Sequence, residues 1–386
     1  MSHGPLAGVR VVELGGQGPV PYCAMTLADL GADVITIRRP GPAAPTNPHN
    51  PVVDRGRRFI AIDLKSAEGI RVARRLISRA DVVLEGFRPG VTERLGLGPA
   101  DLLADNPALV YGRMTGWGQD GPWAQRAGHD INYIALTGAL HAIGAAGGPP
   151  IVPLNLIGDY AGGAMYLALG VTAALLVARE TGRGQVVDAA IADGVAALMS
   201  VIYGLRARGR WRLERGVNLL DGGAPFYRVY ECADGGFVAV GALEEPFYRE
   251  LLDGLGLGDR ADLIDDRLNP ATWPTIERAL AEAFASQPQA HWAEVFADRD
   301  ACVTPVLSPE EATQHPHLVA RRTYVDDGPA GTHAAPVPRF SGTATVTARY
   351  RSPEQTDVRG LLAEYGLDPE EINQLLADGV VGGATW

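Results

Sequence analysis

Cysteine is scarce in this chain of 386 residues, which has only Cys23, Cys232 and Cys302. The three lie far apart, so they form neither a disulfide framework nor the closely spaced ligands of a metal site. The N-terminus also lacks the cationic start and apolar stretch of a signal peptide. The sequence therefore predicts a cytoplasmic protein without a metal. At about 100–200 residues per domain, its length predicts two domains, or three.

Positive charge is also in short supply, since 34 Lys and Arg face 45 Asp and Glu, a net charge of −11. That balance excludes nucleic acid as the main partner, because such proteins need a basic surface. Lysine itself occurs once, at Lys65. A single lysine among arginines indicates a position that needs a compact point charge on a flexible stem, with chance survival as the alternative.

Long uncharged stretches are few, and two stand at mid-chain. Residues 160–178 contain no charge over 19 positions, close to the length that spans a bilayer. The stretch is rich in Ala and Gly, however, and contains Tyr160, Tyr166 and Thr172. We expect a buried core helix here and no membrane association. Residues 194–205 predict a second buried helix.

The first hundred residues alternate between strand and helix patterns. Residues 9–14, 33–37 and 81–84 have the apolar runs of buried strands. Residues 22–31 have helical spacing, and Ser66 is placed to cap a helix that runs to residue 79. Strand–helix–strand order predicts an α/β fold with a Rossmann-like parallel sheet.

A different pattern begins near residue 218. Residues 226–240 alternate as in a hairpin with its turn at 233–236, and two helices follow near 245–255 and 275–286. A last helix starts at Asp368-Pro369. We predict a large α/β domain (1–190), a linker helix region (191–224), a small α+β domain (225–310) and a return segment completing the large domain (311–386).

The turn after the first strand departs from the dinucleotide fingerprint. It has Gly16 and Gly18 but no third glycine, and Arg38 and Arg39 stand where an acid would hold a ribose diol. A guanidinium there suits a phosphate, so a phosphorylated ribose is favoured over nicotinamide. Positive residues gather from 38 to 65, and a solvated basic face is the alternative. They are Arg38, Arg39, Arg55, Arg57, Arg58 and Lys65.

Two mid-chain residues are candidates for proton transfer. His129 lies in Gly-His-Asp-Ile-Asn-Tyr at residues 128–133, and Asp159 precedes the long apolar helix, where the helix dipole favours negative charge. Taken alone, His129 also fits a hydrogen-bonded core histidine, and Asp159 a plain N-cap.

These motifs resemble the family III CoA-transferase superfamily, and within it the alpha-methylacyl-CoA racemases. The resemblance covers nearly the whole chain, including Leu-Ala-Asp-Leu-Gly-Ala-Asp at 27–33, Glu-Gly-Phe-Arg-Pro-Gly-Val at 85–91 and Asp-Ala-Cys-Val-Thr-Pro at 300–305. Gly-His-Asp-Ile-Asn-Tyr separates the racemases from the transferases best.

The resemblance implies an isomerase that epimerises 2-methylacyl-CoA through an enolate, with His129 and Asp159 as proton-transfer groups. Glu244 would assist His129, although Glu-Glu-Pro replaces the usual Glu-Pro-Gln and leaves Glu245 as the alternative. CoA would be substrate, with no separate cofactor, and the chains would form an interlocked homodimer of rings. The implied CoA contacts are Arg39, Ile62, Asp63, Leu64, Lys65, Gly86, Phe87, Arg88, Arg94, Gly128, Asp130, Ile131, Asn132 and Tyr133.

The chemistry needs a base on one face of a planar enolate and an acid on the other, and His and Asp can both be tuned towards neutral pH. The N–H groups near Asp159 and Tyr160 are candidate donors to the enolate oxygen. Two alternatives stay open at this point. One is a CoA-transferase with Asp159 as nucleophile, and the other is a non-catalytic acyl-CoA-binding protein.

Overall fold

The computed structural model describes residues 4–41, 50–343, 345 and 352–383. It divides into two compact units, each made of discontinuous chain. The first comprises Met1–Thr137, Leu154–Leu198 and His317–Trp386, and the second comprises Gly138–Pro153 and Met199–Pro316. Residues 138–153, which the sequence placed in the large domain, thus group with the second unit. The predicted domain boundaries near residues 190, 224 and 310 stay predictions.

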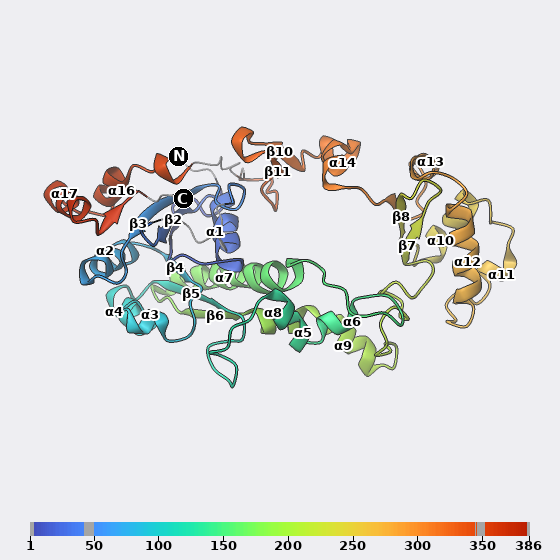
Figure 1. Ribbon diagram of the computed structural model, residues 1–386, viewed down its shortest axis with the longest axis horizontal. Coiled ribbons are helices and arrows are strands. Elements are labelled where there is room, and N and C mark those ends of the chain that lie inside the picture. Colours follow the sequence, from blue (N-terminus) through green and yellow to red (C-terminus); the bar gives the residue numbers. More distant parts are fainter. Residues whose placement is uncertain (1–3, 42–49, 344, 346–351, 384–386) are drawn as a thin grey trace. The chain divides into compact units, whose positions relative to one another are not determined.

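A seven-stranded sheet forms the centre of the first unit, in the order β12-β3-β2-β1-β4-β5-β6 (Figure 1). All neighbours are parallel except β12, which is antiparallel to β3. The order 3-2-1-4-5-6 is that of a doubly wound fold, with its switch point between β1 and β4. The predicted α/β class and parallel sheet are confirmed. The strands are β1 (Arg10–Glu13), β2 (Asp33–Arg38), β3 (Arg57–Ile62), β4 (Val82–Glu85), β5 (Val110–Thr115), β6 (Val186–Ala190) and β12 (Val381–Gly382).

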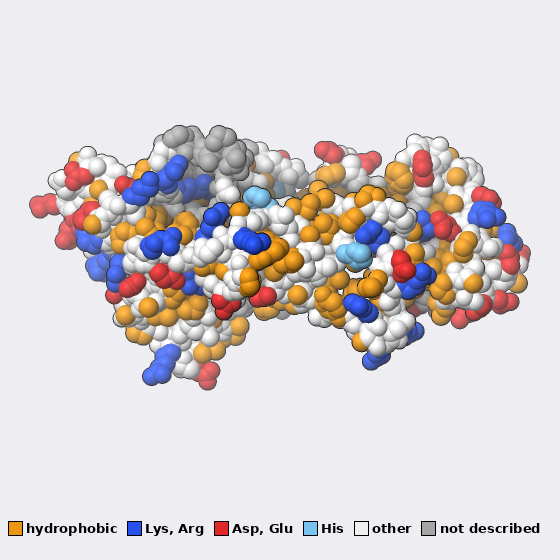
Figure 2. All heavy atoms as spheres, turned by 60° about the horizontal axis from the view of Figure 1, so that its bottom comes forward, with side chains coloured by type: hydrophobic (Ala, Val, Ile, Leu, Met, Phe, Trp, Pro, Cys, Tyr) orange, Lys and Arg blue, Asp and Glu red, His pale blue; other side chains and the backbone are white. Residues whose placement is uncertain are grey.

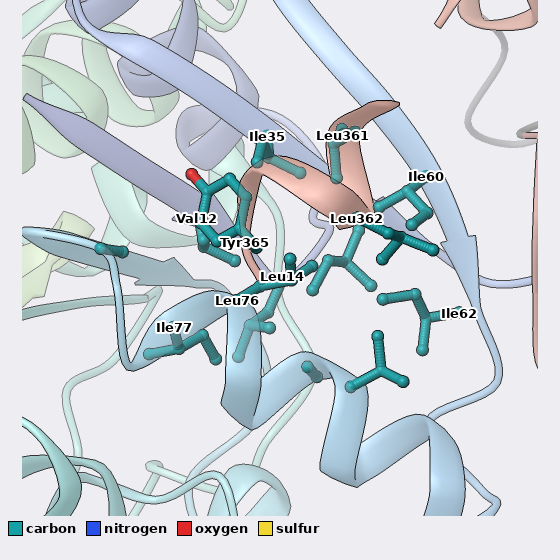
Figure 3. Packing of buried hydrophobic residues seen from close by; sticks show 14 of the residues in the cluster. Val12, Leu14, Ile35, Ile60, Ile62, Leu76, Ile77, Leu361, Leu362 and Tyr365 are labelled. Atoms are coloured by element: carbon teal, nitrogen blue, oxygen red, sulfur yellow. The ribbon is translucent and has the colours of Figure 1, made fainter. Parts of the chain in front are cut away.

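Helices cover the sheet on both faces. On one face, Val12 and Ile35 pack in a single buried cluster with Leu76 of α2 and Leu361 of α16, so the end of the chain completes a core begun by its first strands (Figure 3). On the other face, α7 approaches β5 closely, because a Cβ at Gly112 would lie 3.0 Å from Val171. The helices are α1 (Pro19–Asp29), α2 (Ala67–Ile77), α3 (Val91–Arg94), α4 (Pro99–Asp105), α5 (Asp130–Leu136), α7 (Met165–Thr181), α8 (Ile191–Leu198), α16 (Val358–Glu364) and α17 (Pro369–Ala377).

Two helix boundaries show how local sequence acts. The Ser66 hydroxyl accepts a hydrogen bond from the Gly69 N–H and caps α2, as predicted. Helix α1 begins at Pro19 rather than at residue 22, because proline already has the backbone angle of a first helical residue and has no N–H to satisfy.

The long apolar stretch is a π-helix, η1 (Leu156–Ala164), continued by α7. By length and composition, Leu156–Thr181 is apolar enough to cross a membrane, and half of its apolar window is buried within the protein. Leu167 and Val171 are fully buried, whereas Leu169 and Leu176 are 65% and 67% exposed. The predicted core helix is therefore buried on one face only.

The prediction of one buried helix over residues 194–205 is wrong. Helix α8 ends at Leu198, and α9 (Ser200–Ala207) has no buried residue. The lack of charge predicted helical structure, but it did not predict which helix faces would be buried against other elements.

The second unit contains the predicted hairpin, β7 (Arg228–Glu231) and β8 (Phe237–Val240), which β9 (Val303–Pro305) extends into an antiparallel sheet. Phe226, Tyr248 and Phe284 lie in its buried core. Its helices are α6 (Ala139–Ala142), α9, α10 (Glu245–Gly254), α11 (Ala261–Ile264), α12 (Trp273–Phe284), α13 (Gln289–Val295) and α14 (Pro309–Gln314). The chain then continues through α15 (Pro316–Ala320), β10 (Tyr324–Asp326) and β11 (Thr332–Ala334).

Candidate active site

A cavity of about 190 Å³ lies where β1, β4 and β5 end, at the switch point of the sheet. Ligands of doubly wound folds bind at this place, because neighbouring connections leave the sheet in opposite directions there. His129 and Asp159 both line the cavity, so the structure brings the predicted pair together. The lining residues are Gln17, Gly18, Pro19, Val20, Gly86, Met114, Thr115, Gly116, Gly128, His129, Tyr133, Asp159 and Ile191.

Asp159 lies in the first turn of η1, half-buried, with its carboxylate against Gly18. A Cβ at Gly18 would lie 3.2 Å from Asp159 Oδ2, so only glycine fits comfortably here, and its φ of 63° also favours glycine. Burial raises the pKa of Asp159, the negative charge of Asp130 adds to the rise, and Asn155 and His129 oppose it. The N-cap residue of η1 is Asn155, so Asp159 is not a plain helix cap.

His129 is the N-cap residue of α5, in extended backbone conformation. Its N–H donates to Asn132 Oδ1 at 3.0 Å. The side chain is exposed and borders the cavity, so His129 is not a buried structural histidine. An exposed imidazole and a half-buried carboxyl group that line one cavity are two groups of the kind that a two-face proton transfer needs.

The Asp130 side chain is buried, and its Oδ2 accepts a hydrogen bond from the Asp159 N–H at 2.7 Å. The Asp159 N–H is therefore already occupied, which corrects the expectation that it would be a donor to an enolate oxygen. The same expectation for the Tyr160 N–H stays a prediction. Sequence alone could not show that a carboxylate 29 residues away takes this donor.

Tyr133 forms a wall of the cavity. Its hydroxyl donates to the Gly128 carbonyl at 2.5 Å, and burial together with nearby Asp159 raises its pKa to about 12. The ring packs edge-on against Trp117 at 4.7 Å, and any Cβ at Gly116 would overlap it. Gly116 and Trp117 are parts of the site that the sequence did not reveal, although both lie in the Thr-Gly-Trp-Gly segment after β5.

The expected phosphate-binding cations fall into two groups. Arg55 pairs with Asp29 at 2.5 Å, Arg58 with Asp33 at 2.6 Å, and Arg38 with Asp54 at 3.2 Å. Arg57 is buried between Glu13 and Asp54. The charges of these four arginines are thus met by carboxylates of the protein, so they do not add to the support that the 38–65 stretch was expected to give a phosphate site.

The other group keeps its charge available. Arg39, Lys65, Arg88 and Arg94 are exposed, and none forms an ion pair with a described residue. Two of them, Arg88 and Arg94, follow β4, whose end borders the cavity through Gly86.

The remaining residues that the resemblance implies as CoA contacts differ in how far their side chains are exposed. Ile62 is buried in the core, which leaves only its backbone for a ligand, and Phe87 packs partly against the same core. The Asp63 carboxylate accepts the Lys65 N–H at 3.0 Å. Leu64 is half-buried, and Ile131 and Asn132 are exposed on α5.

Glu244 and Glu245 lie at the start of α10 in the second unit. Glu245 pairs with Arg249 at 2.7 Å, whereas the Glu244 carboxylate has no hydrogen-bond or ion-pair partner in the described chain. Of the two, Glu244 is therefore the carboxylate still available for another group. No cluster of three or more potential metal ligands occurs among the described residues.

The family model of CoA-transferase family III matches residues 6–356. The alpha-methylacyl-CoA racemases of Mus musculus and Homo sapiens are 45% and 43% identical to this chain, over 97% of its length and 97% of theirs. A crystal structure of a CaiB/BaiF family protein from Brucella suis superimposes with a TM-score of 0.78 at 25% identity, covering 94% of this chain and 100% of that one. The chain therefore belongs to CoA-transferase family III, in which it is similar to the alpha-methylacyl-CoA racemases.

Proposed function

We propose that this protein is an isomerase that interconverts (2R)- and (2S)-2-methylacyl-CoA thioesters by moving a proton through an enolate. The observation that carries the proposal is that His129 and Asp159 line the same cavity at the switch point of the sheet. Racemases at 45% and 43% identity over nearly the full chain support it. CoA enters as part of the substrate, and the residues identified need no further cofactor.

In this mechanism one group of the pair removes the α-proton while the other delivers a proton to the opposite face. Burial raises the pKa of Asp159, which is the direction that a proton-carrying acid needs. Glu244 would orient His129 and support its charged form. The cytoplasm stays the proposed location.

Incubation of one pure 2-methylacyl-CoA epimer in D2O tests the reaction. We expect deuterium at the α-carbon of the product, because the delivered proton comes from a side chain that exchanges with solvent. Proton NMR of the α-hydrogen and 2-methyl signals measures it, with chiral analysis of the product. Acyl transfer to added free acids without α-deuterium would replace this function with CoA transfer through Asp159.

Neutralising Arg39, Lys65, Arg88 or Arg94 should raise KM more than it lowers kcat, because phosphate contacts are similar in the ground and transition states. A lost charged hydrogen bond of about 1.5–3 kcal/mol corresponds to roughly a 10- to 150-fold weaker interaction. Calorimetry with CoA and dephospho-CoA checks Arg39, the proposed partner of the ribose phosphate. Equal affinities for the two ligands would contradict the assignment of Arg39. Arg299→Ala, which removes a positive charge from an exposed ion pair of the second unit, is the control.

We also propose an intertwined homodimer in which Glu244 of one chain serves His129 of the other. Large apolar side chains stand exposed on the first unit, and Figure 2 shows many hydrophobic side chains on one face of the protein. A dimer interface over this unit would cover such side chains. They include Leu136, Met165, Leu169, Leu176, Val177, Val186 and Leu198.

Sedimentation equilibrium beside an activity assay tests the dimer. The expected result is a dimer that does not dissociate on dilution, because threaded chains must unfold before they separate. A fully active monomer would contradict the assembly and the shared role of Glu244.

A further inference from the structure

Asp130 connects the two proposed proton-transfer residues. It follows His129 directly in the chain, and its Oδ2 accepts the Asp159 N–H at 2.7 Å. The approach is close, because a Cβ at Gly158 would lie 2.3 Å from Asp130 Oδ2. Glycine at 158 is thus what allows the carboxylate to reach the first turn of η1.

The burial of Asp130 is costly for the fold. Its side chain is buried, and Oδ1 has no hydrogen-bond partner within the described part of the chain. A buried carboxylate oxygen without a partner loses its hydration and receives nothing in return. Local features that break the rules of stability are expected where function requires them.

We infer that Asp130 is a positioning residue that fixes the Asp159 backbone to the start of α5, and is not a contact for coenzyme A. The inference rests on the proposed function, in which His129 and Asp159 transfer the protons. Because Asp130 is bonded covalently to one member and by a hydrogen bond to the other, it sets their separation across the substrate. An error of about 1 Å in such a separation can cost on the order of 10²-fold in rate.

The charge of Asp130 has a second effect. Three groups act on the pKa of Asp159, namely Asn155, Asp130 and His129. Of these, only Asp130 adds to the rise that burial causes. The negative charge of Asp159 in turn raises the pKa of Tyr133, and the positive charge of Arg88 lowers it. Removing the Asp130 charge therefore lowers the pKa of Asp159.

Two substitutions separate these effects in the full-length protein. Asp130→Ala removes the acceptor, and we expect kcat to fall roughly tenfold or more while KM stays within about twofold. Asp130→Asn keeps a carbonyl oxygen as acceptor, so it should restore most of kcat. It should also move the limb of the kcat–pH profile set by Asp159 to lower pH, in both directions of the reaction. Asp120→Ala, an exposed acid in the loop between β5 and α5, is the control.

A KM increase with unchanged kcat in Asp130→Ala would make Asp130 a substrate contact and overturn the inference. Wild-type kcat in Asp130→Ala, or no shift of the pH limb in Asp130→Asn, would overturn it as well. If Asp130→Ala does not fold, Asp130→Asn and Gly158→Ala decide, and Gly158→Ala should lower kcat without raising KM. Absence of α-deuteration by wild type would instead refute the proposed function itself.

Discussion

Replacing His129 with Ala should lower net epimerisation by about 10²–10⁴-fold, the usual contribution of one positioned proton-transfer group. The loss is expected on one face only, because Asp159 still borders the cavity in the variant. One epimer should continue slow α-hydrogen exchange with retention of configuration. Asp159→Ala should show the mirror behaviour, with the other epimer exchanging.

The measurement is proton NMR of each pure epimer in D2O, for wild type and both variants. Asp120→Ala, which changes an exposed residue outside the cavity lining, serves as control and should retain exchange at both faces. Epimerisation by His129→Ala at the wild-type rate would reduce His129 to a structural residue. Loss of exchange in both epimers with only one of the two variants would mean that the residue replaced in it serves both faces.

Replacing Arg57 with Ala should destabilise the protein by about 3–5 kcal/mol, the usual cost of removing one partner of a buried ion pair. Arg57 bonds Glu13 at 2.5 Å and Asp54, and Thr36 donates to the same Glu13 oxygen at 2.6 Å. The substitution would leave two buried carboxylates on β1 and before β3 without their shared cation. Urea unfolding followed by circular dichroism gives the change in the free energy of unfolding.

Arg39→Ala is the matched control, since Arg39 is exposed and should change stability by no more than about 0.5 kcal/mol. Arg57→Ala should therefore change the free energy of unfolding, whereas Arg39→Ala should change the affinity for CoA. Weaker CoA binding with unchanged stability in Arg57→Ala would return Arg57 to the phosphate site.

Local patterns were sufficient to predict the parallel sheet and the hairpin of the second unit. Apolar runs such as residues 33–37 and the Gly-rich turn at 233–236 fix their structure through nearby residues. Long-range pairing was not accessible in this way. The sequence alone does not distinguish the role of Arg57 from that of Arg39. Only the fold shows that Glu13 and Asp54 surround Arg57.

The candidate site shows the same division. His129 and Asp159 were predicted through the resemblance and lie on one cavity, because their motifs fall at the ends of elements that meet at the switch point. The hydrogen bond from the Asp159 N–H to Asp130 was not predicted, since backbone donors carry no sequence signal. Nor does composition distinguish α8, which buries one face, from the exposed α9.

The pairing of Val381 with Ile62 has a consequence for synthesis. The sheet of the first unit receives its edge strand, and its core receives α16 and α17, only after the ribosome has made residues 358–382. Residues 199–316 of the second unit, by contrast, are contiguous and include all three strands of its small sheet. Since domains generally fold as units during synthesis, the middle of the chain can fold first. The apolar strands β1, β2 and β3 are therefore made well before the helices and the strand that cover them.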